Sequence, residues 1–300
     1  MTVRAAFDIG SNSVKVVAAE RLDAPRLDAV TVCGLGEGLP ATGRLSEPAM
    51  ERTLDALADL VRRARAAGAS DFAAVGTQSL RRASNAAEFL RRAEARCGLA
   101  VEIIPGEEEA RLSFLAARSG AGAPDGPCLL FDVGGGSTEF IRGEGDALGA
   151  RLSLELGCLH LREAHERSDP IRPDELAAMQ RAAADALAPL GREPATLVGI
   201  GGTVTSLGTV ALGTDWDPAR LEGMALSRAQ VEAQLERFAS LRVEARAALP
   251  GLLPARAPVI LAGAAIVLAI LRHLDAPGLR LSARALRHGL WLDRWGGARG

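Results

Sequence analysis

Short apolar runs, separated by turn residues, open both halves of the chain. In the first half, Ala5 to Ile9, Val14 to Ala19 and Ala29 to Val32 each have the length and β-favouring composition of a strand. Because only a few residues separate these runs, the pattern predicts a meander of neighbouring strands.

The second half repeats this pattern. Leu129 to Val133 reads as a strand, and returning strands follow at Glu139 to Arg142 and Arg151 to Leu156. A helix is predicted from Pro173 to Leu190, and a further strand from Thr196 to Ile200. The likeness of the two halves indicates a duplicated domain rather than one large sheet.

Helical periodicity lies between the strands. Ser46 caps one helix, with Pro48 in its first turn and Gly68 as its stop. Its apolar face is formed by Met50, Leu54, Leu57 and Val61. Asn85 and Glu88 have the spacing of a capping box for the next helix. Strands that alternate with helices predict an α/β fold.

The most hydrophobic stretch, Val259 to Leu271, predicts a buried core helix. It covers about 13 residues, whereas a membrane-spanning helix needs ~20. The opening Met1-Thr2-Val3-Arg4 runs directly into a strand pattern, so we expect neither a secretory signal nor a membrane partner, and a cytoplasmic location.

Length and charge set further bounds. A chain of 300 residues is long enough for two domains, and its net charge of −2 argues against a protein that wraps nucleic acid over its whole surface. Gly, Ala and Pro dominate from Gly120 to Pro127, which predicts domains at 1–124 and 125–300, with the last helix able to pack back on the first. The widely spaced cysteines favour reduced thiols.

Two acidic glycine loops follow apolar runs at corresponding places, Asp8-Ile9-Gly10-Ser11-Asn12-Ser13 and Asp132-Val133-Gly134-Gly135-Gly136-Ser137-Thr138-Glu139. A strand that ends in Asp and turns through glycines can present N–H groups and hydroxyls to phosphate oxygens, while the carboxylate holds a divalent cation. The loops therefore predict a phosphate-binding site. Read by themselves, the three glycines are also compatible with a plain tight hairpin.

Five motifs occur in the order and spacing of one family. They are the two loops, Gly76-Thr77 with Leu80-Arg81, Gly106-Glu107-Glu108-Glu109-Ala110-Arg111, and Gly201-Gly202-Thr203. Over essentially its whole length the chain resembles the exopolyphosphatase / guanosine pentaphosphate phosphohydrolase family. The resemblance implies two ribonuclease-H-like domains of the actin-like ATPase superfamily with an active-site cleft between them.

The resemblance also implies roles for the acidic residues. Asp132 and Glu139 match positions beside the catalytic Mg²⁺, with Mn²⁺ as an alternative, and Asp8 would add an outer-sphere carboxylate. Glu109 matches the catalytic glutamate that orients and deprotonates the attacking water. Without the resemblance, three glutamates at a helix start are explained by the helix dipole.

The remaining matched positions are expected to bind phosphate. They are Ser11, Asn12, Lys15 and Arg81 on one side, and Gly134, Gly135, Gly136, Ser137, Thr138, Gly202 and Thr203 on the other. Lys15 is the sole lysine of the chain. Arg256 lies where family members place an Arg shortly before an acidic residue, but Ala257 and Pro258 follow here, so its role is left open.

The resemblance implies an enzyme that hydrolyses phosphoanhydride bonds. The predicted activity is Mg²⁺-dependent release of terminal orthophosphate from polyphosphate, with removal of the γ-phosphate of pppGpp as the alternative. An ATP-dependent kinase or actin-like ATPase, and a non-catalytic protein that binds polyphosphate or guanosine alarmones, are the readings from other classes. A homodimer is expected from the family alone.

Overall fold

Contacts divide the chain between two α/β units, each built around its own mixed sheet. The computed structural model describes residues 2–120, 126–145, 147–193 and 195–296. The first unit comprises Met1–Ala116 together with Leu286–Gly300, and the second comprises Ala117–Ala285. The boundary expected at 124 and 125 lies outside the described residues.

The sheet of the first unit has the order β3-β2-β1-β4-β5. Its strands are β1 (Val3–Ile9), β2 (Ser13–Ala19), β3 (Leu27–Val32), β4 (Ala69–Gly76) and β5 (Glu102–Ile103). The first three form the predicted antiparallel meander, and β4 and β5 add in parallel. Its helices are α1 (Leu39–Thr42), α2 (Glu47–Ala66), α3 (Gln78–Arg82), α4 (Ala86–Cys97), α5 (Gly106–Arg118), which crosses the division, and α13 (Leu286–Trp295).

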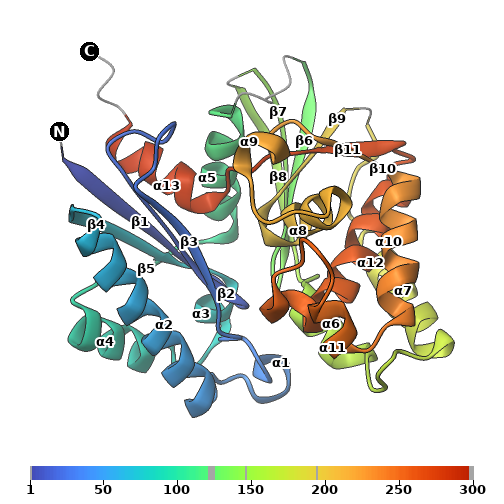
Figure 1. Cartoon of the computed structure of the whole chain (residues 1–300), viewed down its shortest axis with the longest axis horizontal. Helices are drawn as coiled ribbons and strands as arrows, with labels where there is room; N and C mark the ends of the chain where they lie inside the picture. The colour runs from blue at the N-terminus through green and yellow to red at the C-terminus, as the bar shows by residue number, and fades with distance from the viewer. Residues whose placement is uncertain (1, 121–125, 146, 194, 297–300) are drawn as a thin grey trace. The chain divides into compact units, whose positions relative to one another are not determined.

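Alternate residues of β1 enter two different cores, as the period of a strand requires. Ala5 and Phe7 pack with the apolar faces of α2 and α4, whereas Ala6 packs with Leu290 and Trp291 of α13. Figure 1 shows α2 and α4 together beside the first sheet. The strand is apolar on both sides because both faces of the sheet are covered.

The sheet of the second unit has the order β10-β11-β9-β6-β7-β8. Its strands are β6 (Cys128–Val133), β7 (Thr138–Glu144), β8 (Ala147–Leu154), β9 (Thr196–Ile200), β10 (Ala225–Ser227) and β11 (Gly278–Leu281). Read from β8, an antiparallel meander is followed by parallel β9 and β11, as in the first unit. The two sheets confirm the α/β class with two ribonuclease-H-like units.

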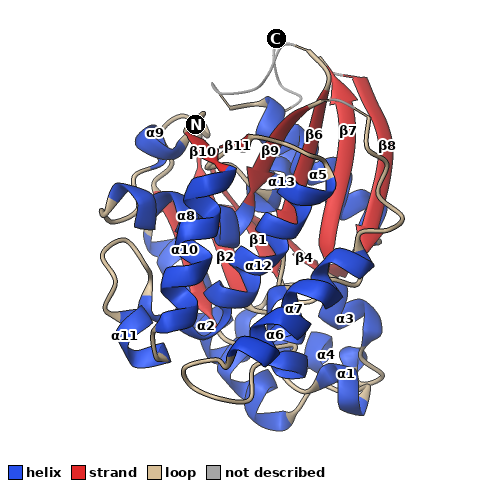
Figure 2. Cartoon of the chain, turned by 90° about the vertical axis from the view of Figure 1, so that its right-hand side faces the viewer, coloured by secondary structure: helices blue, strands red, loops and turns tan. Residues whose placement is uncertain are grey.

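Helices line the sheet of the second unit, as Figure 2 shows. They are α6 (Cys158–His165), α7 (Pro173–Ala186), α8 (Gly201–Leu212), α9 (Pro218–Leu221), α10 (Arg228–Ser240), α11 (Val243–Ala247), the 3₁₀ turn η1 (Pro254–Arg256) and α12 (Ala257–His273). Together, η1 and α12 are long and apolar enough to span a membrane, but 83% of their most apolar window is buried within the fold. Every residue of Val259 to Leu271 is buried, which confirms the predicted core helix.

Some local predictions were wrong. The strand expected at Arg151 to Leu156 is β8, which begins at Ala147. Asn85 makes no side-chain cap on α4, because its amide oxygen accepts from the Leu45 N–H at 2.9 Å and its amide nitrogen donates to the Leu45 carbonyl at 3.0 Å. A long-range contact thus replaces the local one.

Charged contacts hold α13 on the first sheet. The guanidinium of Arg287 donates to the Asp28 carboxylate of β3 at 2.7 Å, and His288 Nε2 lies 3.3 Å from the other carboxylate oxygen. Burial by itself would raise the pKa of Asp28, but the attraction of Arg287 and the hydrogen bonds from His288 and Arg287 hold that pKa well below its usual range. Asp28 is therefore ionised whenever the unit is folded near neutral pH.

We expect Asp28→Asn to destabilise the first unit by about 3–5 kcal/mol at neutral pH, because Arg287 is left buried without its partner. Because the pKa of Asp28 is lower in the folded state, this carboxylate contributes stability that is complete above its unfolded-state pKa of about 3.9. That stability is lost as the pH falls through the folded-state pKa. Urea unfolding should therefore show the gap between wild type and variant closing in acid.

Asp23→Asn is the matched control, since Asp23 and Arg21 form an exposed pair that is expected to contribute little. If the difference in unfolding free energy between wild type and Asp28→Asn did not change with pH, this account of the contact would be wrong.

Candidate active site

The loop between β1 and β2 closes as a tight hairpin, here called the first hairpin. The Gly10 N–H donates to the Ser13 carbonyl at 3.0 Å, and Asp8 stands directly opposite Lys15 in the register. Lys15 Nζ lies 2.7 Å from Asp8 Oδ2, and the Asp8 side chain is only 4% exposed. The sole lysine thus binds the carboxylate that was predicted to stand near the metal.

Buried donors gather around this hairpin. Ser11 Oγ donates to Gln78 Oε1 at 3.2 Å, whereas Asn12 Nδ2, Gln78 Nε2 and Ser79 Oγ have no hydrogen-bond partner among the described residues. Unsatisfied buried donors are rare in native proteins and call for an acceptor. An oxyanion such as a phosphate supplies several acceptor oxygens, so the donors fit the predicted ligand. Gln78 and Ser79 were missed, although the Thr77 to Arg81 run held them.

Glu109 is held by an arginine from another helix. Arg81 Nη1 donates to Glu109 Oε2 at 2.8 Å and to the Ile104 carbonyl at 2.9 Å. Arg81 was predicted to bind phosphate. The structure places it against the predicted catalytic carboxylate, and its contact with phosphate stays a prediction. The contact with Arg81 orients the Glu109 carboxylate.

The neighbouring glutamates have different surroundings. Glu108 forms a two-point contact with Arg111 of its own helix, at 2.7 and 2.8 Å, and Glu107 is exposed. Among the three glutamates at the start of α5, Glu109 is the one that Arg81 of α3 orients. The sequence pattern could not separate the three without the family resemblance.

The loop between β6 and β7, here called the second hairpin, has the same turn. The Gly134 N–H donates to the Ser137 carbonyl at 2.9 Å, and Asp132 stands directly opposite Glu139. Directly opposite residues project from the same face of a sheet, so the two carboxylates are neighbours. Glu139 Oε1 accepts from Ser137 Oγ at 2.7 Å and from Ser153 Oγ at 3.0 Å. Ser153 was missed, although its place on the third strand of the meander was a usable signal.

The first turn of α6 holds the glycine loop. The Cys158 N–H donates to the Gly134 carbonyl at 2.9 Å, and the Leu159 N–H donates to the Gly135 carbonyl at 2.9 Å. In a trans peptide the N–H points opposite to the carbonyl, so the N–H groups of Gly135 and Gly136 are turned away from α6. The helix thereby orients the amides that were predicted to bind phosphate.

The hydroxyls of two further predicted residues donate to backbone carbonyls. The hydroxyl of Thr203 donates to the Val133 carbonyl at 3.0 Å, and the hydroxyl of Thr138 donates to the Leu156 carbonyl. Both threonines are buried, so these bonds fix the ends of the glycine loop. Whether either hydroxyl also accepts from a ligand stays a prediction.

Glycines at the start of α8 leave room for charged side chains. A Cβ on Gly201, whose φ is +80°, would lie 2.0 Å from Asp132 Oδ1, and one on Gly202 would lie 1.9 Å from the Arg256 guanidinium. Arg256 is 8% exposed, and the sequence left its role open. The structure brings it into the same cluster as Asp132, the glycine loop and Gly202.

The donor set of the second hairpin fits Mg²⁺. This ion takes one or two carboxylates and completes its octahedron with waters and phosphate oxygens, and Asp132 and Glu139 supply such a pair. Within the described ranges no group of three or more His, Cys, Asp and Glu residues is placed to hold a metal by itself. Burial raises the pKa of the Cys158 thiol, which keeps the thiol protonated.

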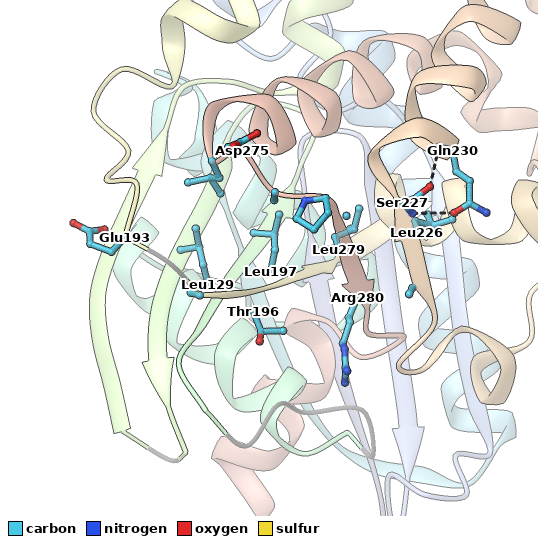
Figure 3. Close-up of a pocket in the computed structure, with 16 residues that line it drawn as sticks. Leu129, Glu193, Thr196, Leu197, Leu226, Ser227, Gln230, Asp275, Leu279 and Arg280 are labelled. Atoms are coloured by element: carbon cyan, nitrogen blue, oxygen red, sulfur yellow. Dashed lines mark hydrogen bonds between the residues drawn. The ribbon is translucent and has the colours of Figure 1, made fainter.

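A cavity of about 630 Å³ lies elsewhere in the second unit (Figure 3). Leu129, Thr196 and Leu197 line it near the starts of β6 and β9, whereas Asp132 and Gly201 lie at the opposite ends of these strands. Ser227 and Gln230, which also line it, hydrogen-bond to each other's backbone N–H groups in the capping box of α10. The lining of this cavity is mainly apolar, so it does not suit a polyanion.

Comparisons with known proteins show which family the chain belongs to. The sequence profile of the Ppx/GppA phosphatase family matches residues 30–296. The chain is 34% identical to a guanosine-5'-triphosphate,3'-diphosphate pyrophosphatase of Photobacterium profundum, over 95% of this chain and 58% of that protein. It is 32% identical to exopolyphosphatase 2 of Mycobacterium tuberculosis, over 91% of each protein.

A solved structure agrees as well. The Aquifex aeolicus Ppx/GppA family member has 30% sequence identity and a TM-score of 0.82, and the match covers 100% of this chain and 99% of that one. The chain therefore belongs to the Ppx/GppA phosphatase family, which confirms the resemblance drawn from the motifs. It spans just over half the length of the Photobacterium protein, at 58%.

Gly157→Ala tests whether the first turn of α6 constrains the glycine loop. Gly157 has an ordinary extended φ of −127°, but a Cβ there would lie 2.3 Å from the Gly135 carbonyl oxygen and the Gly136 nitrogen. We expect the variant to lose about 1–3 kcal/mol in urea unfolding, the usual cost of overpacking.

The control for this variant is Gly126→Ala, because a Cβ on Gly126 meets nothing within 4 Å. Equal stability of Gly157→Ala and the control would show that α6 does not constrain the loop.

Proposed function

We propose that the chain is a Mg²⁺-dependent exopolyphosphatase, which releases orthophosphate from the end of inorganic polyphosphate. The observation that carries the proposal is Glu109 held by Arg81, because a fixed carboxylate is what a water-activating base requires. The acid pair and glycine loop of the second hairpin support it. The relative that matches over 91% of both chains is named an exopolyphosphatase, which favours polyphosphate over pppGpp.

In the proposed reaction, Glu109 accepts a proton from water as the water oxygen attacks the terminal phosphorus. The bond between that phosphorus and the bridging oxygen breaks, and the shortened polyphosphate leaves with the electron pair. The transition state is loose, so positioning and charge neutralisation matter more than covalent assistance. Mg²⁺, when held by Asp132 and Glu139, would neutralise phosphate oxygens.

Other residues bind and orient the substrate in this proposal. The N–H groups of Gly135 and Gly136 would donate to the phosphate that is cleaved. The Ser137 hydroxyl donates to Glu139, so phosphate binding by Ser137 stays a prediction. Asn12, with the unpartnered donors of Gln78 and Ser79 beside it, would hold further phosphate oxygens. The Ser11 hydroxyl donates to Gln78, so phosphate binding by Ser11 stays a prediction. The cytoplasmic location, the homodimer and the outer-sphere role of Asp8 stay predictions.

The substrate is tested by phosphate release from short polyphosphate, long polyphosphate, pppGpp and ATP, each with Mg²⁺ and with a chelator as control. We expect release from both polyphosphates to exceed release from pppGpp and ATP. Release from pppGpp alone would move the assignment to the alternative substrate, and ATP consumption stimulated by a sugar or acid acceptor would indicate a kinase. No release from any substrate would contradict the proposal.

Glu109→Gln is expected to lower turnover at least ~100-fold with substrate binding largely retained, because the amide cannot accept the proton from water. Steady-state turnover and equilibrium binding of polyphosphate measure the two effects separately. Glu107→Gln is the matched control, since that glutamate begins the same helix but is exposed. Turnover by Glu109→Gln equal to that of the control would remove Glu109 from its role.

A further inference from the structure

The two hairpins are copies of each other in their backbone. In each, an Asp is the next-to-last residue of the first strand and pairs directly with the residue seven positions later, Asp8 with Lys15 and Asp132 with Glu139. In each, a glycine N–H closes the turn on a serine carbonyl, at 3.0 and 2.9 Å. The same backbone therefore offers the same location for a cation.

The side chains that cross the three meander strands differ in charge. In the first unit, Lys15 of β2 stands between Asp8 and Val30 of β3. In the second unit, Glu139 of β7 stands between Asp132 and Ser153 of β8. We call these the first row and the second row. At the central position, an ammonium in one row is replaced by a carboxylate in the other.

Each row has a different requirement for an outside cation. In the first row, Lys15 Nζ lies 2.7 Å from Asp8 Oδ2, and the side chains are 16% and 4% exposed. The charges of this pair cancel, which is what a buried carboxylate needs. The second row places two carboxylates side by side, and Glu139 is only 1% exposed.

The surroundings of the two rows agree with this division. Ser137 and Ser153 both donate to Glu139 Oε1, so the second row is fixed as a set of oxygen ligands. Val30, at the same position of the first row, offers no ligand atom and is 39% exposed. A divalent cation at the first row would be repelled by the positive charge of Lys15.

We propose that Lys15 is a built-in cation that takes the place of a second divalent metal at the first hairpin, so that the chain holds its divalent metal at the second hairpin only. The second part rests on the proposed function, whereas the role of Lys15 can be tested without turnover. Asp8 then contacts an ammonium rather than a metal. The duplicated fold has kept one metal-dependent hairpin and one that supplies its own positive charge.

The test is the number of Mn²⁺ ions bound per substrate-free chain, measured by electron paramagnetic resonance. Lys15→Glu recreates the acid pair of the second row and should bind one more Mn²⁺ than wild type. The gain should persist in the Lys15→Glu, Glu139→Gln double variant, because it arises at the other hairpin. Lys15→Arg, which keeps the charge, should show no gain.

A second measurement covers the case in which Lys15→Glu folds poorly. Lys15→Met leaves the buried Asp8 without a partner, so Mn²⁺ should raise its thermal unfolding temperature more than that of wild type. This extra stabilisation should vanish in the Asp8→Asn, Lys15→Met double variant. Absence of both the gain in stoichiometry and the extra stabilisation would overturn the proposal for Lys15.

Glu139→Gln in the wild-type background separates the two proposals. It should remove the Mn²⁺ ion that wild type binds. If it does not, the metal site of the proposed function is wrong, and the restriction to the second hairpin is wrong with it. The gain in Lys15→Glu still reports on the first hairpin alone.

Discussion

The hydrogen bond from a glycine N–H to a serine carbonyl, which closes each hairpin, is the constraint on which the site depends. It fixes the turn, and the turn fixes the register, so an aspartate at the end of one strand stands opposite a chosen residue of the next. A slip of one residue would turn that partner to the other face of the sheet. The two hairpins share this backbone frame, so the chemistry at each is decided by one side chain, Lys15 in one unit and Glu139 in the other.

Around these frames, charges are held by partners that are themselves anchored. Arg81 binds Glu109 and a backbone carbonyl at once, and the first turn of α6 holds the carbonyls of the glycine loop. Such supports fix a reacting group before substrate arrives, which lowers the reorganisation that a reaction requires. The residues expected to contact substrate or metal are therefore held by a second set of groups, and most of these supporting groups are backbone N–H and carbonyl groups.

Much of the fold and the chemical parts of the site follow from the sequence, because strand period, glycine loops and helix caps are local signals. The meander, the core helix around Gly263 and the acidic residues of the loops were predicted in this way. Partners brought together by folding were not. Arg81 meets Glu109, Asn85 meets Leu45, and Gly157 meets Gly135, and no local pattern encodes these contacts. The sequence showed Lys15 as the sole lysine, but it did not show that Lys15 pairs with Asp8.

The last helix belongs to the unit that the chain begins. Leu286, Leu290 and Trp291 of α13 complete the core formed with Ala6 and Val17, and Trp291 Nε1 donates to the Arg4 carbonyl at 3.1 Å. During synthesis, the first unit therefore lacks α13 on this face of its sheet until the whole second unit has been made. The second unit can therefore finish folding before the first, although the first begins earlier in the chain.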